Sequence, residues 1–285
     1  MIKLSKRLSA IAELVSKGTV LADVGTDHGY LPIYLIQAST CDKAFALDLR
    51  EGPLNRAREH VQAANLSSYI ECRLSDGLHS LMTREADSIV IAGMGGQTMQ
   101  TILMEGSAIA HGAKELILQP QSELAAFRRF LYEEGYGILA ENMVCEDGKF
   151  YPMMKCVWGG GSSAGGQQIL ATENEAFLLQ TDTPEARNQS PGLQMEKPRK
   201  ISQELSFLYG EKLLAARHPV LKEYLLTRQE KLGQILVGLE KGKRVLLSDE
   251  VALRQENRRE ELRQELVLLQ QALALYSAMS SGTTN

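Results

Sequence analysis

Short apolar runs alternate with amphipathic stretches along the first 158 residues of the chain. Six runs have the length and composition of buried strands: Val20–Val24, Lys43–Leu47, Ile70–Arg73, Ser88–Ala92, Glu115–Gln119 and Gly137–Val144. Between them, apolar residues recur at helical spacing, most clearly over Gly52–Ala64, Gln97–Ala110 and Ser122–Glu134. This alternation predicts right-handed βαβ crossovers and a doubly wound, mostly parallel α/β sheet.

The two ends of this region add a helix and a hairpin. Apolar residues at helical spacing from Leu4 to Val15 predict a short amphipathic helix before the first strand. The apolar run Phe150–Trp158 can pair with Ile138–Val144 across the polar turn at 146–149. The sheet is therefore expected to end in an antiparallel pair of strands.

Residues 159–196 interrupt this pattern with a glycine-rich opening and two proline-containing turns. They predict a flexible linker that contains one short helix at Thr172–Leu179. From Gln203 onward the chain is expected to be helical. The expected organisation is a ligand-binding α/β domain over 1–158, a linker or insertion over 159–200, and a helical coiled-coil domain over 201–285.

Leucines in the tail recur on the 4-3-4 rhythm that is typical of a helical seam. In the first helix the seam residues are Leu221, Leu225, Leu232, Ile235 and Leu239, with Arg228 at the missing position. In the second helix they are Leu262, Leu266, Leu269, Leu273 and Tyr276. The matching seams predict an antiparallel coiled-coil hairpin, whose turn carries Lys241, Lys243 and Arg244.

The composition is that of an ordinary globular protein, with 44% hydrophobic residues and a net charge of -4. No apolar run approaches the ~20 residues of a membrane-spanning helix, and the N-terminus lacks the apolar core of a secretion signal. We therefore expect a cytoplasmic protein with no membrane partner. The four cysteines form no Cys-x-x-Cys pair, so no metal is expected. Residues 1–158 carry 15 Lys or Arg and 19 Asp or Glu, whereas residues 197–285 carry 15 and 11, which makes the tail basic.

Acidic residues and glycines follow the first four predicted strands. The end of the first strand and the turn after it hold Asp23, Gly25, Asp27, His28 and Gly29, and Asp48 directly follows the second strand. Asp76 and Gly77 follow the third strand, and Gly93, Met94, Gly95 and Gly96 follow the fourth. Because the carboxyl ends of parallel strands lie at one edge of a sheet, these residues are expected to converge on one ligand site.

The acidic content of this site favours a cationic ligand over a phosphate. Asp48 stands where a carboxylate can accept hydrogen bonds from both hydroxyls of a ribose. Asp27 would repel a pyrophosphate, whereas S-adenosylmethionine carries a sulfonium and an α-ammonium group and no phosphate. Asp76 can accept a hydrogen bond from the adenine amino group. The pattern favours S-adenosylmethionine as the cofactor, with a nicotinamide oxidoreductase as a less favoured alternative.

Four motifs of the chain and its helical tail resemble the bacterial TrmK family. The motifs are Asp23–Pro32, Ile91–Gly96, Ile117–Gln121 and Gly148–Tyr151. The resemblance implies a Rossmann-like class I methyltransferase domain and S-adenosylmethionine-dependent methylation of N1 of adenine 22 in the D-arm of tRNA. The chain departs from the family at 159–196, which looks like an insertion, and at Gln121, where Asn is common.

Adenine N1 has a lone pair in the plane of the ring, so its attack on a methyl group needs no deprotonation. Catalysis is then expected to depend mainly on placement. The candidates for catalytic contacts are Asp27, His28, Gln119, Gln121 and Tyr151. Holding the first turn is the alternative for His28, loop bracing for the two glutamines, and strand packing for Tyr151. The candidates for RNA contact are Lys6, Arg7, Lys241, Lys243 and Arg244, for which a solvated surface is the alternative.

Two further functions fit the same sequence. One is a class I methyltransferase that acts on another tRNA or rRNA base, and the other is a non-catalytic module that binds the donor. A coiled-coil seam can pair within one chain or between two, so a monomer or a weak homodimer is expected.

Overall fold

The computed structural model describes residues 2–160, 201–241 and 249–277 of the chain. The strands are β1 (Thr19–Val24), β2 (Cys41–Asp48), β3 (Ile70–Leu74), β4 (Ser88–Met94), β5 (Glu115–Pro120), β6 (Tyr136–Glu146) and β7 (Lys149–Trp158). The helices are α1 (Lys6–Leu14), α2 (Tyr30–Gln37), α3 (Glu51–Ala63), α4 (Gly96–Glu105), α5 (Ser107–Gly112), α6 (Leu124–Glu133), α7 (Gln203–Tyr209), α8 (Glu211–Ala215), α9 (Pro219–Lys241) and α10 (Asp249–Ser277). The short helix expected at 172–179 lies outside the described residues.

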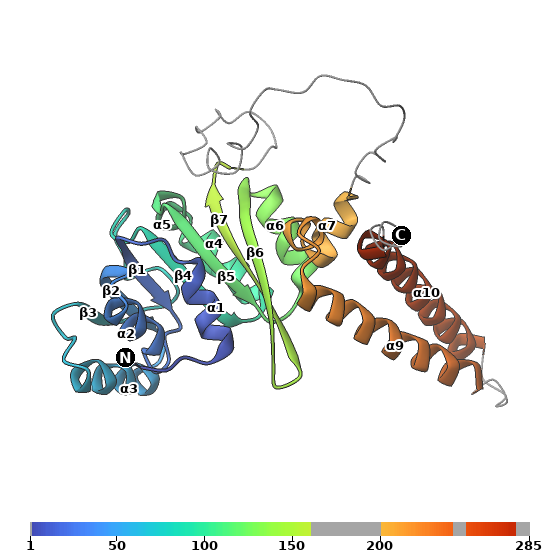
Figure 1. The fold of residues 1–285 in the computed structure, drawn as a ribbon, viewed down its shortest axis with the longest axis horizontal. Helices are drawn as coiled ribbons and strands as arrows, with labels where there is room; N and C mark the ends of the chain where they lie inside the picture. Colours follow the sequence, from blue (N-terminus) through green and yellow to red (C-terminus); the bar gives the residue numbers. More distant parts are fainter. Residues whose placement is uncertain (1, 161–200, 242–248, 278–285) are drawn as a thin grey trace, which may run out of the picture.

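The strands form one sheet in the order β3-β2-β1-β4-β5-β7-β6 (Figure 1). β1 to β5 run parallel, and β7 runs antiparallel to both β5 and β6. The predicted parallel sheet with an antiparallel end is therefore confirmed. The strand order reverses between β1 and β4, which is the point where doubly wound folds bind ligands.

Alternate residues of the central strands contribute to two apolar clusters, one on each face of the sheet. In β4, Ile89 and Ile91 pack in one cluster and Val90 in the other. Phe127 of α6 joins the first cluster, and Ile11 of α1 joins the second. Successive side chains of a strand point to opposite faces, so a strand between two helical layers is apolar throughout. This explains why the central strands appear in the sequence as continuous apolar runs.

The helix expected over Gln97–Ala110 is instead two helices, α4 and α5. The first ends at Glu105, and the second begins at Ser107. Gly106 between them has low helix propensity and closes α4 through its N–H, which donates to the carbonyl of Ile102 at 3.0 Å. The apolar spacing continues across the break, so the pattern alone did not indicate it.

In the tail, α9 and α10 pack side by side and antiparallel (Figure 1). Leu221, Leu225 and Leu232 of α9 are buried with Leu262 and Leu269 of α10, as the seams predict. The polar seam position is filled by an ion pair, in which Arg228 Nε lies 2.6 Å from Glu265 Oε1.

The prediction for Ile235 was wrong. Its side chain is 45% exposed, and Leu236 packs in the cluster instead. A regular 4-3-4 count places Ile235 on the seam, whereas the helix in fact turns the next residue inward.

The tail rests on the outer strand β6 and on α6. Arg128 of α6 pairs with Glu141 of β6 at 2.9 Å, and both side chains are almost fully buried. Arg128 Nη1 also donates to the carbonyls of Phe207 and Leu208, at 3.1 and 3.2 Å. Further along, the ring of Phe150 on β7 meets the ring of Tyr224 on α9 edge-on at 5.3 Å. The long β6–β7 hairpin, at one edge of the sheet, therefore lies between the parallel strands and the tail (Figure 1).

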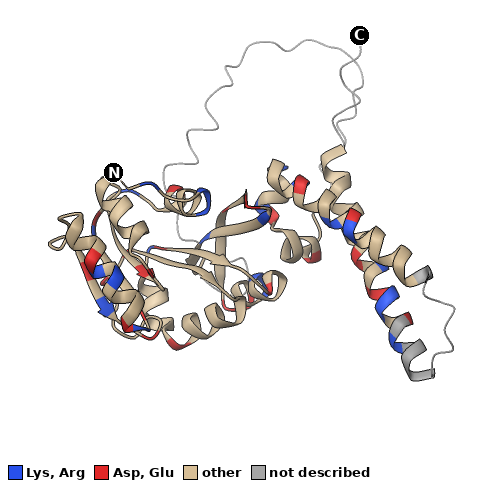
Figure 2. Cartoon of the chain, turned by 90° about the horizontal axis from the view of Figure 1, so that it is seen from below, with Lys and Arg blue, Asp and Glu red and all other residues tan. Residues whose placement is uncertain are grey.

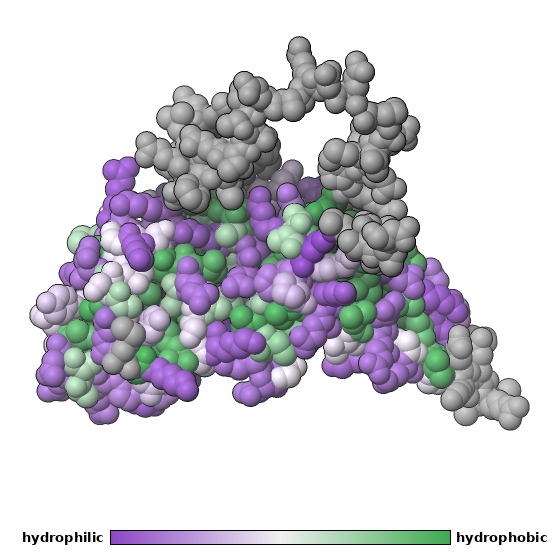
Figure 3. All heavy atoms as spheres, in the orientation of Figure 1, coloured by the Kyte–Doolittle hydropathy of each residue, from purple (hydrophilic) through white to green (hydrophobic). Residues whose placement is uncertain are grey.

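Among the described helices, none is both long and apolar enough to cross a membrane. On the face shown in Figure 3, hydrophobic residues are interspersed with hydrophilic ones over both the sheet and the tail.

Candidate functional site

A cavity of about 600 Å³ opens at the carboxyl ends of the parallel strands. Seven of the residues proposed for donor binding line it: Gly25, Asp27, Asp48, Asp76, Gly77, Gly93 and Met94. The far wall comes from α4, where Gln97, Thr98 and Thr101 face the cavity. This wall was not predicted, although the polar residues that directly follow the glycines of the fourth strand were a usable signal.

Asp48 lies at the floor of the cavity, buried at the end of β2. Its Oδ2 accepts the N–H of Asp27 at 3.2 Å, and its Oδ1 accepts the N–H of Arg50 at 2.9 Å. Each carboxylate oxygen has a second lone pair, so Asp48 can still accept two hydrogen bonds from a ligand. Two vicinal hydroxyls, as on a ribose, supply that pair of donors.

The first turn follows β1 and is tied to β2 by its backbone. The N–H groups of Gly25 and Thr26 both donate to the carbonyl of Leu47, at 2.8 and 2.9 Å. Gly25 has a φ of +73°, and a side chain there would collide with the methyl group of Met94. Only glycine leaves the edge of the cavity open at this position.

A smaller hollow of about 120 Å³ adjoins the cavity and shares Gly25, Asp27 and Ala92 with it. It contains one buried acid, Asp23, and one base, Arg7. Burial raises the pKa of Asp23 to about 6, against the lowering effect of a 2.7 Å hydrogen bond from Thr26 Oγ1. The nearby charge of Asp48 also raises this pKa, and the charge of Arg7 lowers it. An acid and a base in one hollow match a zwitterion such as the amino-acid end of a methionine derivative.

Arg7 was predicted to contact RNA, and the structure places it in this hollow instead. Its Nη1 donates to Gln119 Oε1 at 3.0 Å, and its guanidinium carbon lies 5.7 Å from the centre of the Tyr151 ring. The signal was in the sequence, because Arg7 stands four residues before Ile11 and so shares the buried face of α1. Its position here favours a role in the site over a phosphate contact.

Gln119 belongs to β5, beside β4, and is fully buried. Its Oε1 also accepts the N–H of Gly93 at 3.2 Å, and its Nε2 donates to the carbonyl of Pro120 at 3.1 Å. This position favours the bracing alternative. Gln121, by contrast, is exposed, and its backbone N–H is fixed by the carbonyl of Met94 at 2.8 Å. Of the two glutamines, Gln121 is therefore the one that a substrate base can reach.

Asp27 and His28 occupy the outer lip of the first turn. Asp27 Oδ1 pairs with Arg56 Nη2 at 3.0 Å, and its Oδ2 lies 3.4 Å from His28 Nε2. The His28 ring stacks on Tyr30 with centroids 5.2 Å apart. Within the described residues, His28 Nδ1 is buried without a hydrogen-bond partner. His28 both holds the turn and lines the smaller hollow, so the structure keeps both of its proposed roles open.

Three of the glycines proposed for donor binding lie behind the cavity wall. A side chain at Gly95 or Gly96 would meet Ser122, at 3.0 Å from its Oγ and 2.7 Å from its carbonyl oxygen respectively. Gly29 packs in the same way against Ala57 of α3. These positions shape the site by close packing of its loops.

The residues proposed for RNA contact do not form one surface in the described part of the chain. The Lys6 ammonium donates to the carbonyl of Cys145 at 3.0 Å and so ties α1 to the β6–β7 hairpin. Lys241 ends α9. Figure 2 shows acidic and basic residues interleaved along α10. The basic excess of the tail comes from residues outside the described ones, namely Lys197, Arg199, Lys200, Lys243 and Arg244.

Together the sheet order, the reversal at β1 and β4, and an acidic cavity at the strand ends define a class I methyltransferase domain. The family model described as "Methyltransferase domain" matches residues 4–154. The tRNA (adenine(22)-N(1))-methyltransferase of Bacillus subtilis is 36% identical over 235 residues, which cover 79% of this chain and 98% of that protein. On these grounds the chain belongs to the TrmK family.

Solved structures support the same relationship. The crystal structure of B. subtilis TrmK, described as an m1A22 tRNA methyltransferase, superposes with a TM-score of 0.71 at 28% identity, covering 95% of this chain and 99% of that one. Sp1610 of Streptococcus pneumoniae, solved in complex with S-adenosyl-L-methionine, gives a TM-score of 0.70 at 28% identity, covering 95% and 100%.

Proposed function

We propose that this chain is an S-adenosylmethionine-dependent methyltransferase that methylates N1 of adenine 22 in the D-arm of bacterial tRNA, acting in the cytoplasm. The observation that carries the proposal is the pairing of the acidic cavity with the adjoining hollow that holds Asp23 and Arg7. Relatives that this chain covers over nearly their whole length are named for this activity or bind this donor.

The residues present fit S-adenosylmethionine group by group. The carboxylate of Asp48 can accept hydrogen bonds from the ribose hydroxyls, and that of Asp76 can accept one from the adenine amino group. Asp23 pairs with the α-ammonium group, and Arg7 with the α-carboxylate. Four carboxylates, of Asp27, Asp48, Asp76 and Glu105, line the large cavity against one cation, Arg50. This acidic excess disfavours a diphosphate and favours a cationic ligand, which supports this donor over a nicotinamide cofactor.

The donor supplies a methyl group on a sulfonium. In the transfer, the lone pair of adenine N1 forms the new N–C bond as the C–S bond breaks, and the electron pair of that bond stays on sulfur. The sulfonium becomes a neutral thioether, and the base becomes cationic. The chain's own residues need only orient the two partners, and placement of this kind can contribute about 7–11 kcal/mol.

The target base would enter beside the first turn. Tyr151 and His28 offer ring faces there, and Gln121 offers an exposed carboxamide. A base inside a stem has to leave its stack before an enzyme can reach it, and aromatic side chains stabilise the extruded form. Asp27 lies close enough to the same lip to stabilise the positive charge that develops on the base.

We assign tRNA binding to residues 201–285, including Lys241, Lys243 and Arg244 between the two long helical segments of the sequence, and donor binding to residues 1–158. The seam between α9 and α10 is filled within one chain, which supports a monomer or a weak homodimer. No metal enters the proposed reaction.

Turnover with bulk tRNA tests the proposal. The protein is incubated with unmodified tRNA and S-adenosylmethionine, and the nucleosides are then analysed by mass spectrometry. The proposal predicts N1-methyladenosine in an amount that grows with time. Donor binding without turnover would support a non-catalytic module, and a different methylated nucleoside would redirect the assignment to another base.

A further inference from the structure

The loop that follows β3 carries the adenine contact proposed above. Asp76 and Gly77 line the large cavity, and Asp76 is exposed. No described side chain pairs with the Asp76 carboxylate, so it is available to a ligand. Recognition by a single carboxylate on a loop depends on how firmly the loop is held, because a displacement of 1 Å weakens a hydrogen bond severely.

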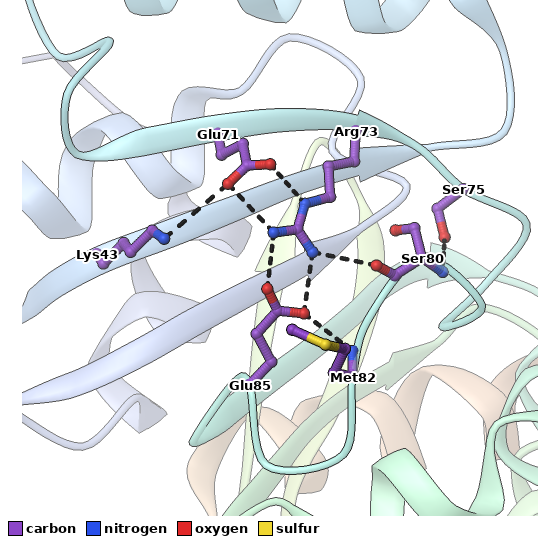
Figure 4. Close-up of polar contacts among 7 residues, drawn as sticks. All are labelled: Lys43, Glu71, Arg73, Ser75, Ser80, Met82 and Glu85. Carbon is purple, nitrogen blue, oxygen red and sulfur yellow. Dashed lines mark hydrogen bonds and ion pairs between the residues drawn. The ribbon is translucent and has the colours of Figure 1, made fainter.

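Arg73, near the end of β3, bonds to this loop without lining the cavity (Figure 4). Its Nη2 donates to Glu85 Oε1 at 2.7 Å, and its Nη1 donates to Glu85 Oε2 at 2.9 Å. Nη1 also donates to the carbonyl of Ser80 at 3.1 Å. The guanidinium lies over the ring of Phe45 on β2, 4.2 Å from its centre. Arg73 thus joins the middle and the end of the loop to the sheet.

Two serines extend this restraint to the cavity wall. The N–H of Ser80 donates to Ser75 Oγ at 3.1 Å, and Ser75 Oγ donates to the carbonyl of Gly77 at 2.9 Å. The N–H of Ser75 donates to the carbonyl of Asp48 at 2.9 Å. Asp76 lies between Ser75 and Gly77, so its backbone is held from the Asp48 side and from the Arg73 side.

The hydrogen-bonded network around Arg73 is shielded enough from solvent to hold its side chains in one arrangement. The Arg73 and Glu85 side chains are only 22% and 14% exposed, and a bidentate pair in that setting is held more firmly than an exposed one. Glu71 on the outer side accepts from Arg73 Nε at 2.8 Å. A lysine has a single ammonium group and cannot bond both Glu85 oxygens, Ser80 and Glu71 in this planar arrangement.

We propose that Arg73 is a positioning residue for adenine recognition: through Glu85 and Ser80 it holds the loop so that Asp76 meets the 6-amino group of the donor. Arg73 is not among the residues that line the cavity, so it acts without touching the donor. This inference rests on the proposed function, because it takes the cavity to hold S-adenosylmethionine or its product.

Paired ligands separate positioning from general damage. Calorimetry measures the dissociation constants of S-adenosylhomocysteine and of S-inosylhomocysteine, in which oxygen replaces the 6-amino group. In the wild type, loss of a hydrogen bond to a carboxylate is expected to weaken binding about 10- to 100-fold. In Arg73→Lys that ratio is expected to fall to about threefold or less, mainly because S-adenosylhomocysteine binds more weakly.

Two further variants complete the design. Lys43→Gln is the matched control, since Lys43 meets Glu71 at 3.9 Å in the same network and forms no described hydrogen bond or ion pair with the loop, so this variant should keep the wild-type ratio. Glu85→Gln keeps the shape of the side chain that anchors the loop but removes its charge. It replaces Arg73→Lys in the comparison if Arg73→Lys does not fold, and the same fall in the ratio is expected.

The outcomes are distinguishable. Equal loss of affinity for both ligands, or an unchanged ratio in Arg73→Lys and Glu85→Gln, overturns the positioning role. A wild type that does not discriminate between the two ligands overturns it as well, because Asp76 then reads no amino group. A wild type that binds neither ligand overturns the proposed function itself.

Discussion

The buried carboxyl group of Asp23 predicts that donor binding weakens in acid. Asp23 has a pKa raised to about 6 by burial, whereas its ordinary value is 3.8. If only the ionised form pairs with the α-ammonium group, a single titration at about 6 makes binding about tenfold weaker at pH 5 than at pH 7. Asp23→Asn removes this titration, so its affinity should be low and insensitive to pH over the same range.

The same group has the opposite effect on folding. The folded state holds the Asp23 proton more tightly than the unfolded chain does, so this residue favours folding as pH falls through 6 towards 4. At pH 7 the charged, buried carboxylate costs about 3 kcal/mol, because the pKa of Asp23 is about 6 instead of 3.8 and each tenfold change in proton affinity corresponds to about 1.36 kcal/mol. Asp23→Asn should therefore raise the free energy of unfolding at pH 7, with this value as the upper bound. Thr26 Oγ1 can still donate to the carboxamide oxygen.

The assay pairs calorimetry with chemical denaturation, using S-adenosylhomocysteine because it carries the same amino-acid group. Binding is measured at half-unit steps from pH 5 to pH 7 for the wild type and Asp23→Asn. Wild-type affinity for S-adenosylhomocysteine that does not change between pH 5 and pH 7 would show that ionised Asp23 does not pair with the ligand. So would an Asp23→Asn variant that binds as tightly as the wild type, since a fully buried acid would then have no ligand to pair with.

Three further outcomes are expected. Asp48→Ala should weaken donor binding at least about tenfold in calorimetry through loss of its hydrogen bonds to the ribose, and unchanged affinity would remove Asp48 from the site. Arg128→Ala should lower the free energy of unfolding by about 3–5 kcal/mol in denaturant, because it leaves buried Glu141 unpaired; a change below about 1 kcal/mol would contradict that burial. Reversing the charges of Lys243 and Arg244 should weaken tRNA binding and flatten its salt dependence while donor affinity stays constant, and an unchanged salt slope would exclude phosphate contact.

Much of the fold followed from apolar periodicity, because the central strands are buried on both faces and their runs are unambiguous. The sequence predicted helix boundaries and buried tail residues less well where a single residue determines them. Gly106 divides one helical pattern into α4 and α5, and Leu236 replaces Ile235 at the tail interface. Hydrophobic spacing carries no information on either, since a break at one glycine and a rotation of one residue leave the pattern intact.

The candidate site shows a similar division. Asp48, Asp76 and Gly25 line one cavity as expected, because strand ends in a parallel sheet converge by topology alone. Arg7 was assigned to RNA because a cation on a first helix resembles a surface charge, and only tertiary packing brings it to Gln119 and Asp23. The spacing of Arg7 from Ile11 indicated that its side chain lies on the buried face of α1, but the residues that it meets there come from distant segments and are set by packing.

Methylation of N1 of adenine 22 is tested with two unmodified tRNA transcripts, one wild type and one with guanosine in place of adenine 22. Each is incubated with the protein and labelled S-adenosylmethionine, and methyl incorporation is mapped by mass spectrometry. We expect close to one methyl group per wild-type transcript, at N1 of adenine 22, and none in the substituted transcript. Equal incorporation into both transcripts would contradict it.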